Sequence, residues 1–194
     1  LTATILPYKT EDYSFAHISM HNKVHYSPEE KFQIESYGYE YFEGENYSLF
    51  NWNDVWFSIY CCYELTSIID RSLFMSENDV LIAVEWNHDV NYYSNILESL
   101  SRDLHCYCVQ VNTSDYGDSR IMRPSKTVEK DVIRTKGGKN STILVEELDI
   151  DALRKFQVKG YNLQKDDKMF KPTPPQFIVG KILDKIKGIL WDKL

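Results

Sequence analysis

Two adjacent cysteines stand where a strand pattern gives way to a helical one. The run 55–61 is apolar and rich in β-branched and aromatic residues, which predicts a buried strand, and a helix is expected over 64–75. Cys62 at this junction is suited to act as a nucleophile, because a sharp turn exposes its side chain and a helix start stabilises a thiolate. A free cysteine has a pKa of about 8.5 and needs such help at neutral pH. The alternative is that Cys61 and Cys62 are small buried hydrophobic residues.

Two other groupings of ligand-type side chains are weaker. Histidines recur every fourth residue over 17–25, but this stretch is predicted as a strand, where successive histidines would lie about 13 Å apart and could not share an ion. Cys61 and Cys62, taken with Cys106 and Cys108, lack the Cys-x-x-Cys spacing of a thiolate zinc site, and alternation along strands explains both pairs. We therefore expect no metal and no cofactor.

The elements that must position Cys62 alternate in type along the chain. Strand-like runs lie at about 13–20, 55–61, 80–86, 106–112 and 141–146. Besides 64–75, helices are expected from a capping Ser27 to Gly38, over 92–104, from Asp149 onward, and over 177–191. This alternation predicts an α/β or layered α+β fold.

Three units are expected along the sequence. Residues 1–156 form the main domain, 157–176 read as an extended connector rich in proline, and 177–194 carry an amphipathic helix that packs on the domain or on a partner. The chain starts at Leu1, not Met, which we interpret as the sign of a part of a longer protein.

Composition excludes several classes. The chain has 194 residues and a formal net charge of −7, from 22 basic against 29 acidic residues, so direct binding of nucleic acid by this segment is not expected. No apolar run approaches the roughly 18 residues of a membrane span. All four cysteines sit in apolar stretches, which favours reduced thiols and a cytoplasmic location.

A family resemblance follows from the order of the motifs. Cys62-Tyr63-Glu64 after an apolar strand resembles the nucleophile motif of the nitrilase, or carbon–nitrogen hydrolase, superfamily. Upstream, Asn-Lys-Val-His-Tyr-Ser-Pro-Glu-Glu at 22–30 is similar to the lysine motif of that family. Downstream, the stretches that resemble later family segments are 79–87, 101–106, 112–121 and Pro124. The resemblance covers about residues 13–148.

This resemblance implies a Glu–Lys–Cys site. Cys62 would attack the carbon of a nitrile or amide and form a thioimidate or thioester. Lys23 would stabilise the tetrahedral intermediate together with the backbone N–H of Tyr63, and Glu30, or alternatively Glu29, would be the supporting carboxylate. Such a lysine favours the thiolate by charge pairing, and a carboxylate keeps the lysine protonated and aimed.

The resemblance also implies a pocket and a fold. The substrate pocket would be lined by Tyr63, Glu64, Trp86 and Asn87. The fold would be a four-layer α-β-β-α sandwich whose N-terminal part is missing from this chain. The general-base glutamate of the family comes from upstream of the lysine motif, and the only glutamate before Lys23 is Glu11, whose context does not match. The base therefore lies outside this chain or is absent.

A narrower resemblance concerns the larger protein. The nitrilase-like domain joined to some bacterial reverse transcriptases of antiviral defence systems is similar to this sequence at 85–89, 102–106, 110–114 and 116–120. It implies an upstream polymerase domain as a partner, besides a small nitrile or amide substrate and a homo-oligomer or packing on that upstream domain. Two functions stay open: a thiol hydrolase, or a catalytically silent module for binding or assembly.

Overall fold

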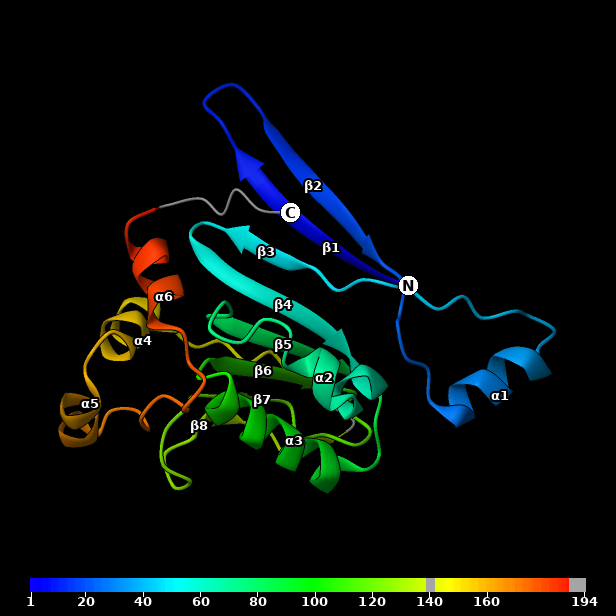
Figure 1. The fold of residues 1–194 in the computed structure, drawn as a ribbon. Helices are drawn as coiled ribbons and strands as arrows, with labels where there is room; N and C mark the ends of the chain where they lie inside the picture. Colours follow the sequence, from blue (N-terminus) through cyan, green and yellow to red (C-terminus); the bar gives the residue numbers. More distant parts are fainter. Residues whose placement is uncertain (139–141, 189–194) are drawn as a thin grey trace.

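A computed structural model describes residues 1–138 and 142–188, and its centre is a six-stranded sheet (Figure 1). The strand order is β3-β4-β5-β6-β7-β8, and β4, β5 and β6 run parallel. The strands of this sheet are Leu49–Trp52 (β3), Val55–Cys61 (β4), Val80–Glu85 (β5), Tyr107–Asn112 (β6), Arg120–Met122 (β7) and Asp131–Arg134 (β8). A separate antiparallel hairpin comprises Thr2–Lys9 (β1) and Ser14–His21 (β2).

The helices follow the expected order. They are Pro28–Ser36 (α1), Ile68–Arg71 (α2), Val90–Asp103 (α3), Ile150–Gln157 (α4), Tyr161–Asp167 (α5) and Val179–Ile186 (α6), with a 3-10 helix at Cys62–Thr66 (η1). Among the residues described, no helix is long and apolar enough to cross a membrane.

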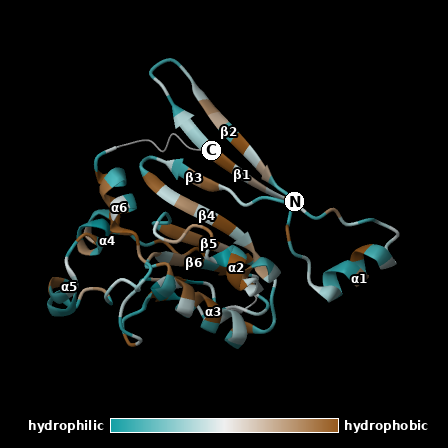
Figure 2. Ribbon diagram, viewed as in Figure 1, coloured by the Kyte–Doolittle hydropathy of each residue, from teal (hydrophilic) through white to brown (hydrophobic). Residues whose placement is uncertain are grey.

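One face of the sheet is covered by α3. Its apolar side chains recur at helical spacing, and Ile96, Leu97 and Leu100 are buried with Leu81 and Ala83 of β5 in one core cluster. Apolar residues follow the central strands in Figure 2, the pattern of strands that are covered on both faces. Because β4, β5 and β6 are parallel neighbours, their carboxyl ends lie together at one end of the sheet, and α3 packs against the sheet below them.

The hairpin covers part of the opposite face. Leu6 of β1 joins a second cluster with Phe57 and Val80 of the sheet. Trp52 Nε1 donates to the carbonyl of Pro7 at 3.0 Å, which fixes the hairpin over β3. Helix layer, sheet and hairpin give three of the layers of an α-β-β-α sandwich.

Most predicted elements are confirmed, within a few residues at their ends. The strands expected at 13–20, 55–61, 80–86 and 106–112 are β2, β4, β5 and β6, and the helices after Ser27, over 92–104 and after Asp149 are α1, α3 and α4. The expected helix at 177–191 is α6, with 189–191 outside the described residues.

Three expectations about elements are wrong. Residues 142–146 form no strand: within the described part of the chain they pair with no other strand, and Ile143 and Val145 stay exposed. The helix at 64–75 is broken into η1 and α2, because Ser67 caps a new start by accepting from the N–H of Asp70. The connector 157–176 is not extended throughout: Gln164 in α5 is buried and donates to the backbone carbonyls of Gln157, which ends α4, and of Lys159.

A buried ion cluster joins the last helices to the sheet. Asp79, fully buried just before β5, accepts from Arg154 Nη2 at 2.6 Å, from Lys185 Nζ at 3.1 Å and from the N–H of Trp56 at 2.9 Å. Arg154 comes from α4 and Lys185 from α6, so both helices pack at the amino ends of β4 and β5. Helix α6 therefore packs on this chain, where Ile182 is buried.

Replacing Asp79 by Ala should destabilise the chain by about 3–5 kcal/mol, because Arg154 and Lys185 would remain buried without their counter-charge. The free energy of unfolding in urea measures the loss. Asp115→Ala, at an exposed loop position, is the control and should change it by no more than about 0.5 kcal/mol. Equal stability of the two variants would contradict the role given to the cluster.

Candidate active site

Cys62 lies at the turn that ends β4, at the edge where the parallel strands finish. Its φ of 47° is in the left-handed region, which costs a non-glycine residue about 1 kcal/mol and marks a sharp turn. The half-buried side chain faces a cavity of about 700 Å³. The lining consists of Ser27, Pro28, Glu29, Glu30, Gln33, Cys62, Tyr63, Trp86, Asn87, His88, Tyr93 and Tyr116.

Lys23 is placed between the hairpin and α1. It is buried, and its Nζ donates to Glu30 Oε1 at 2.5 Å. The helix start fixes this carboxylate, because Glu30 Oε2 also accepts from the N–H of Ser27 while Ser27 Oγ accepts from the N–H of Glu30. Burial opposes ionisation of Glu30, but the hydrogen bonds from Lys23 and Ser27 outweigh it, so the pKa of Glu30 is lowered. Glu29 instead accepts from Gln33.

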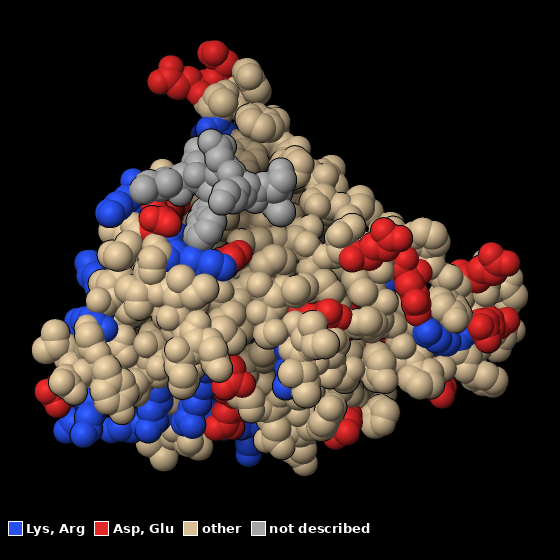
Figure 3. Space-filling view, in the orientation of Figure 1, with Lys and Arg blue, Asp and Glu red and all other residues tan. Residues whose placement is uncertain are grey.

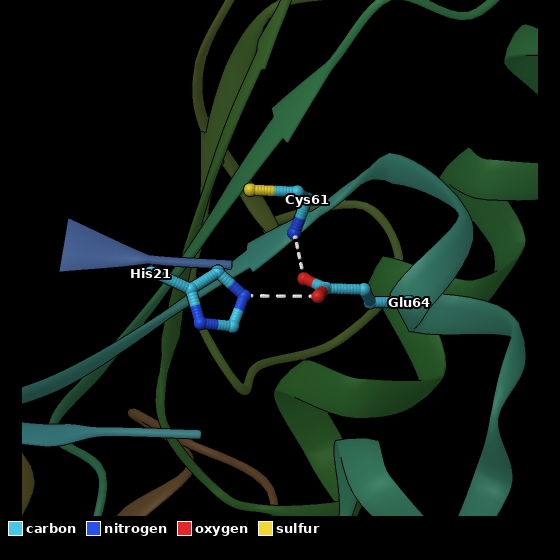
Figure 4. Close-up of side chains that lie close together, drawn as sticks. All are labelled: His21, Cys61 and Glu64. Carbon is cyan, nitrogen blue, oxygen red and sulfur yellow. Dashed lines mark hydrogen bonds and ion pairs between the residues drawn. The ribbon is translucent and has the colours of Figure 1, made fainter. Parts of the chain in front are cut away.

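The carboxylate of Glu64 ties these parts together (Figure 4). Its Oε1 accepts from the N–H of Val24 at 2.7 Å and lies 2.9 Å from His21 Nε2, and its Oε2 accepts from the N–H of Cys61 at 2.6 Å. Glu64 was expected in the pocket, but it is fully buried, with both oxygens engaged, and it does not line the cavity. Its side chain lies outside the cavity and holds the backbone at Val24 and Cys61 in place.

His21, which the sequence presents only as one of the histidines over 17–25, lies beside Glu64 and Cys61. With Cys61 and Glu64 it forms a group whose potential ligand atoms lie within 4.8 Å of one another. Both oxygens of Glu64 already accept hydrogen bonds in this group, so a cation is not needed to explain its burial.

The surroundings of Cys62 favour the neutral thiol. Burial raises the pKa of Cys62, and the charge of Lys23, the hydroxyl of Tyr93 and the backbone N–H of Trp86 oppose this rise only in part. The distance from Sγ to the Tyr93 hydroxyl is 3.9 Å. The expected support from a helix start is small, since only the short η1 follows the strand. The charge of Lys23 therefore lowers the pKa of Cys62, as charge pairing predicts, but desolvation raises that pKa by more.

A second carboxyl acts on the thiol from β5. Glu85 is buried, its Oε2 accepts from Gln110 Nε2 at 2.8 Å, and Gln110 Oε1 in turn accepts from Arg120 Nε at 3.0 Å. Oε1 of Glu85 has no partner among the described residues. Burial raises the pKa of Glu85 to about 7, and its negative charge raises the pKa of Cys62 further. The sequence signal was available: an acid that ends an otherwise apolar strand.

The predicted pocket residues divide. Tyr63, Trp86 and Asn87 line the cavity, and Glu64 does not. Asn87 is held by its backbone, whose N–H donates to Asn112 Oδ1 at 3.0 Å and whose carbonyl accepts from Asn112 Nδ2 at 2.8 Å. This pair joins the carboxyl ends of β5 and β6, so the wall is rigid.

Glu85→Gln should make Cys62 react about two to five times faster with iodoacetamide at pH 8, because removing the negative charge lowers the pKa of the thiol. At pH 6 the two rates should converge, since wild-type Glu85 is neutral below its pKa of about 7. Glu129→Gln, at an exposed position, should leave the profile unchanged. Equal rates at pH 8 would sink the coupling between Glu85 and Cys62.

Comparison with known proteins rests on structure. The sequence matches no protein-family model, and a search of curated proteins finds no match. A CN-hydrolase superfamily protein of Xanthomonas campestris, with an arsenic adduct in its active site, is similar with a TM-score of 0.54 and 14% identity, over 84% of this chain and 68% of that chain. A mutant of the Nesterenkonia AN1 amidase from the nitrilase superfamily gives 0.52 and 14%, over 78% and 60%. The chain thus spans about two thirds of these proteins, and it has the α/β fold of the nitrilase superfamily.

Proposed function

We propose that this chain is a carbon–nitrogen hydrolase domain in which Cys62 attacks the carbon of a small amide or nitrile. The observation that carries the proposal is a thiol and a carboxylate that line one cavity, with a buried lysine bound to that carboxylate behind the lining. A half-buried thiol on a strained turn faces the cavity, Glu30 lines it, and the buried Lys23 is fixed 2.5 Å from Glu30. Lys23 is close enough for its positive charge to lower the pKa of Cys62.

The residues divide the work of amide hydrolysis. The sulfur of Cys62 bonds to the carbonyl carbon as its proton leaves, and the electron pair of the C=O bond moves onto oxygen. The ammonium of Lys23, aimed by Glu30, and the backbone N–H of Tyr63 stabilise that oxyanion. The C–N bond then breaks, the amine departs with a proton, and water hydrolyses the thioester to an acid and the free thiol. A nitrile reacts by the same attack and gives a thioimidate.

The proton of Cys62 needs an acceptor, because burial keeps this thiol neutral. Glu11 does not fill that role, because it lies in the turn between β1 and β2, at the opposite end of the hairpin from His21 (Figure 1). As the family resemblance implies a base upstream of the lysine motif, the proposal includes a carboxylate supplied from outside residues 1–194 by a larger protein. The stretches at 85–89, 102–106, 110–114 and 116–120 support the proposal that this protein is a bacterial defence-associated reverse transcriptase.

The raised pKa of Cys62 favours a second candidate. A nitrilase-like module that has lost the base would keep the cavity and the fold but not the chemistry, and would serve binding or assembly in the larger protein. An unactivated thiol, with no proton acceptor supplied by the hairpin, is what such a module would show.

Ammonia release from a panel of short amides and nitriles, measured on the larger protein, tests the first candidate. Cys62→Ala should abolish release, and Lys23→Ala should lower kcat/KM at least about 100-fold by removing an oxyanion donor. Lys31→Ala, an exposed lysine on the same segment that pairs with Glu43, is the matched control and should keep full activity. Lys23→Ala should also slow alkylation of Cys62, since the lysine lowers the pKa of that thiol.

Release that persists in Cys62→Ala would refute the thiol mechanism. No release of ammonia from any compound by the wild-type protein would favour the silent module, whereas slow alkylation alone would not, because burial already raises the pKa of Cys62.

A further inference from the structure

One side of the cavity is formed by the start of an acidic segment, which contributes Glu29 and Glu30 to the lining. Segment 28–46, which contains α1, carries six glutamates against a single basic residue, Lys31, and that lysine pairs with Glu43. Acidic side chains gather on the side of the molecule where α1 lies in Figure 3. A concave surface with charge of one sign attracts ligands of the opposite sign and raises their local concentration.

The charges at the cavity itself have the same sign. Two of the lining residues described are glutamates, and none is lysine or arginine. Lys23 stands behind the lining, where Glu30 balances its charge at 2.5 Å. Glu29 has no such partner: it is exposed at the mouth, and its recorded contact is with the neutral amide of Gln33 at 3.1 Å. A negative charge therefore remains at the mouth.

Aromatic rings make up much of the remaining lining. Tyr63, Trp86, Tyr93 and Tyr116 all contribute to the cavity wall. The faces of such rings attract ammonium and guanidinium groups, with tryptophan the strongest, and the attraction grows as the cation loses water. Aromatic rings next to a carboxylate suit a cation better than they suit a neutral or anionic group.

One residue of the cavity lining, Asn87, has a donor without a partner among the described residues. Asn87 is 7% exposed, and its Nδ2 has no hydrogen-bond partner within the described part of the chain, although its Oδ1 accepts from the N–H of Asp89 at 2.9 Å. A buried amide N–H without a partner costs about 1–3 kcal/mol unless something accepts from it. The carbonyl oxygen of an amide is such an acceptor.

From this polarity we propose that the substrate is a small amide or nitrile that carries an ammonium or guanidinium group beyond the bond to be broken. The reactive end lies near Cys62 and Asn87, and the cation lies among the aromatic rings beside Glu29. The proposal rests on the function proposed above, because it assigns the far end of the molecule whose carbon Cys62 attacks.

Charged thiol reagents test it on the full chain at low salt. Modification of Cys62 is followed by mass spectrometry with three methanethiosulfonates: cationic trimethylammonium-ethyl, anionic sulfonatoethyl and neutral methyl. Each rate is divided by the rate with 2-mercaptoethanol, and Cys62→Ser gives the background from the three other cysteines. We expect a normalised cation-to-anion ratio above about 5, which falls toward 1 in high salt.

Glu29→Gln should lower that ratio about threefold and leave the rate of the neutral reagent unchanged. Glu35→Gln, which removes the same charge from an exposed position near the end of α1, should alter the ratio much less, because Glu35 does not line the cavity.

The outcomes separate the two proposals. A ratio of 1 or below in the wild-type chain, or a ratio that Glu29→Gln leaves unchanged, would overturn the cationic substrate while the thiol remains a nucleophile. Failure of all three reagents, the neutral one included, to modify Cys62 would overturn the proposed function and the substrate class with it.

Discussion

The buried carboxylate of Glu64 is the contact on which the arrangement of the site depends. It accepts hydrogen bonds from the N–H of Cys61, on the strand that leads to Cys62, and from the N–H of Val24, next to Lys23. His21, at the end of the hairpin, joins it from the third side. Hydrogen bonds to a charged group are worth about 1.5–3 kcal/mol each, so this one side chain holds two distant segments in register. Without it, the lysine and the thiol would belong to separate surfaces.

The two ends of the sheet use buried charge for different purposes. At the amino end, Asp79 is surrounded by Arg154, Lys185 and a backbone N–H, so its charge is fully compensated and the cluster only fastens helices to the sheet. At the carboxyl end compensation is incomplete. Glu85 keeps one oxygen without a partner among the described residues. For Cys62, the rise in pKa caused by burial exceeds the fall caused by the charge of Lys23. Incomplete compensation raises the pKa of Glu85 to about 7 and the pKa of Cys62 above its usual value, and it occurs where chemistry is proposed.

Desolvation decides the state of the nucleophile. Lysine and thiol side by side suggest a thiolate, yet burial, the charge of Glu85 and the absence of a long helix after Cys62 outweigh the lysine. The site is thus arranged for an oxyanion donor but still needs a proton acceptor. The hairpin does not provide one, since Glu11 lies in its turn at the opposite end from His21 (Figure 1).

The features that could be predicted from the sequence are those set by residues close to one another along the chain. Apolar runs and caps located the central strands β4, β5 and β6 and the helices α1, α3 and α4, and the order of the motifs predicted the nitrilase-superfamily fold that structural similarity bears out. The Ser27–Glu30 helix cap was readable for the same reason, because its partners lie within one turn.

Only the tertiary structure decided what depends on contacts between distant segments. The strand expected at 141–146 failed over its described part, 142–146, for want of a partner, and the expected connector folded back because Gln164 found buried carbonyls. Glu64, which was expected in the pocket, instead binds the backbone N–H of Val24 and the ring of His21. These contacts join residues that are about forty positions apart in the sequence. The neutrality of the Cys62 thiol is of the same kind, because desolvation is a property of everything packed around a group and not of its sequence neighbours.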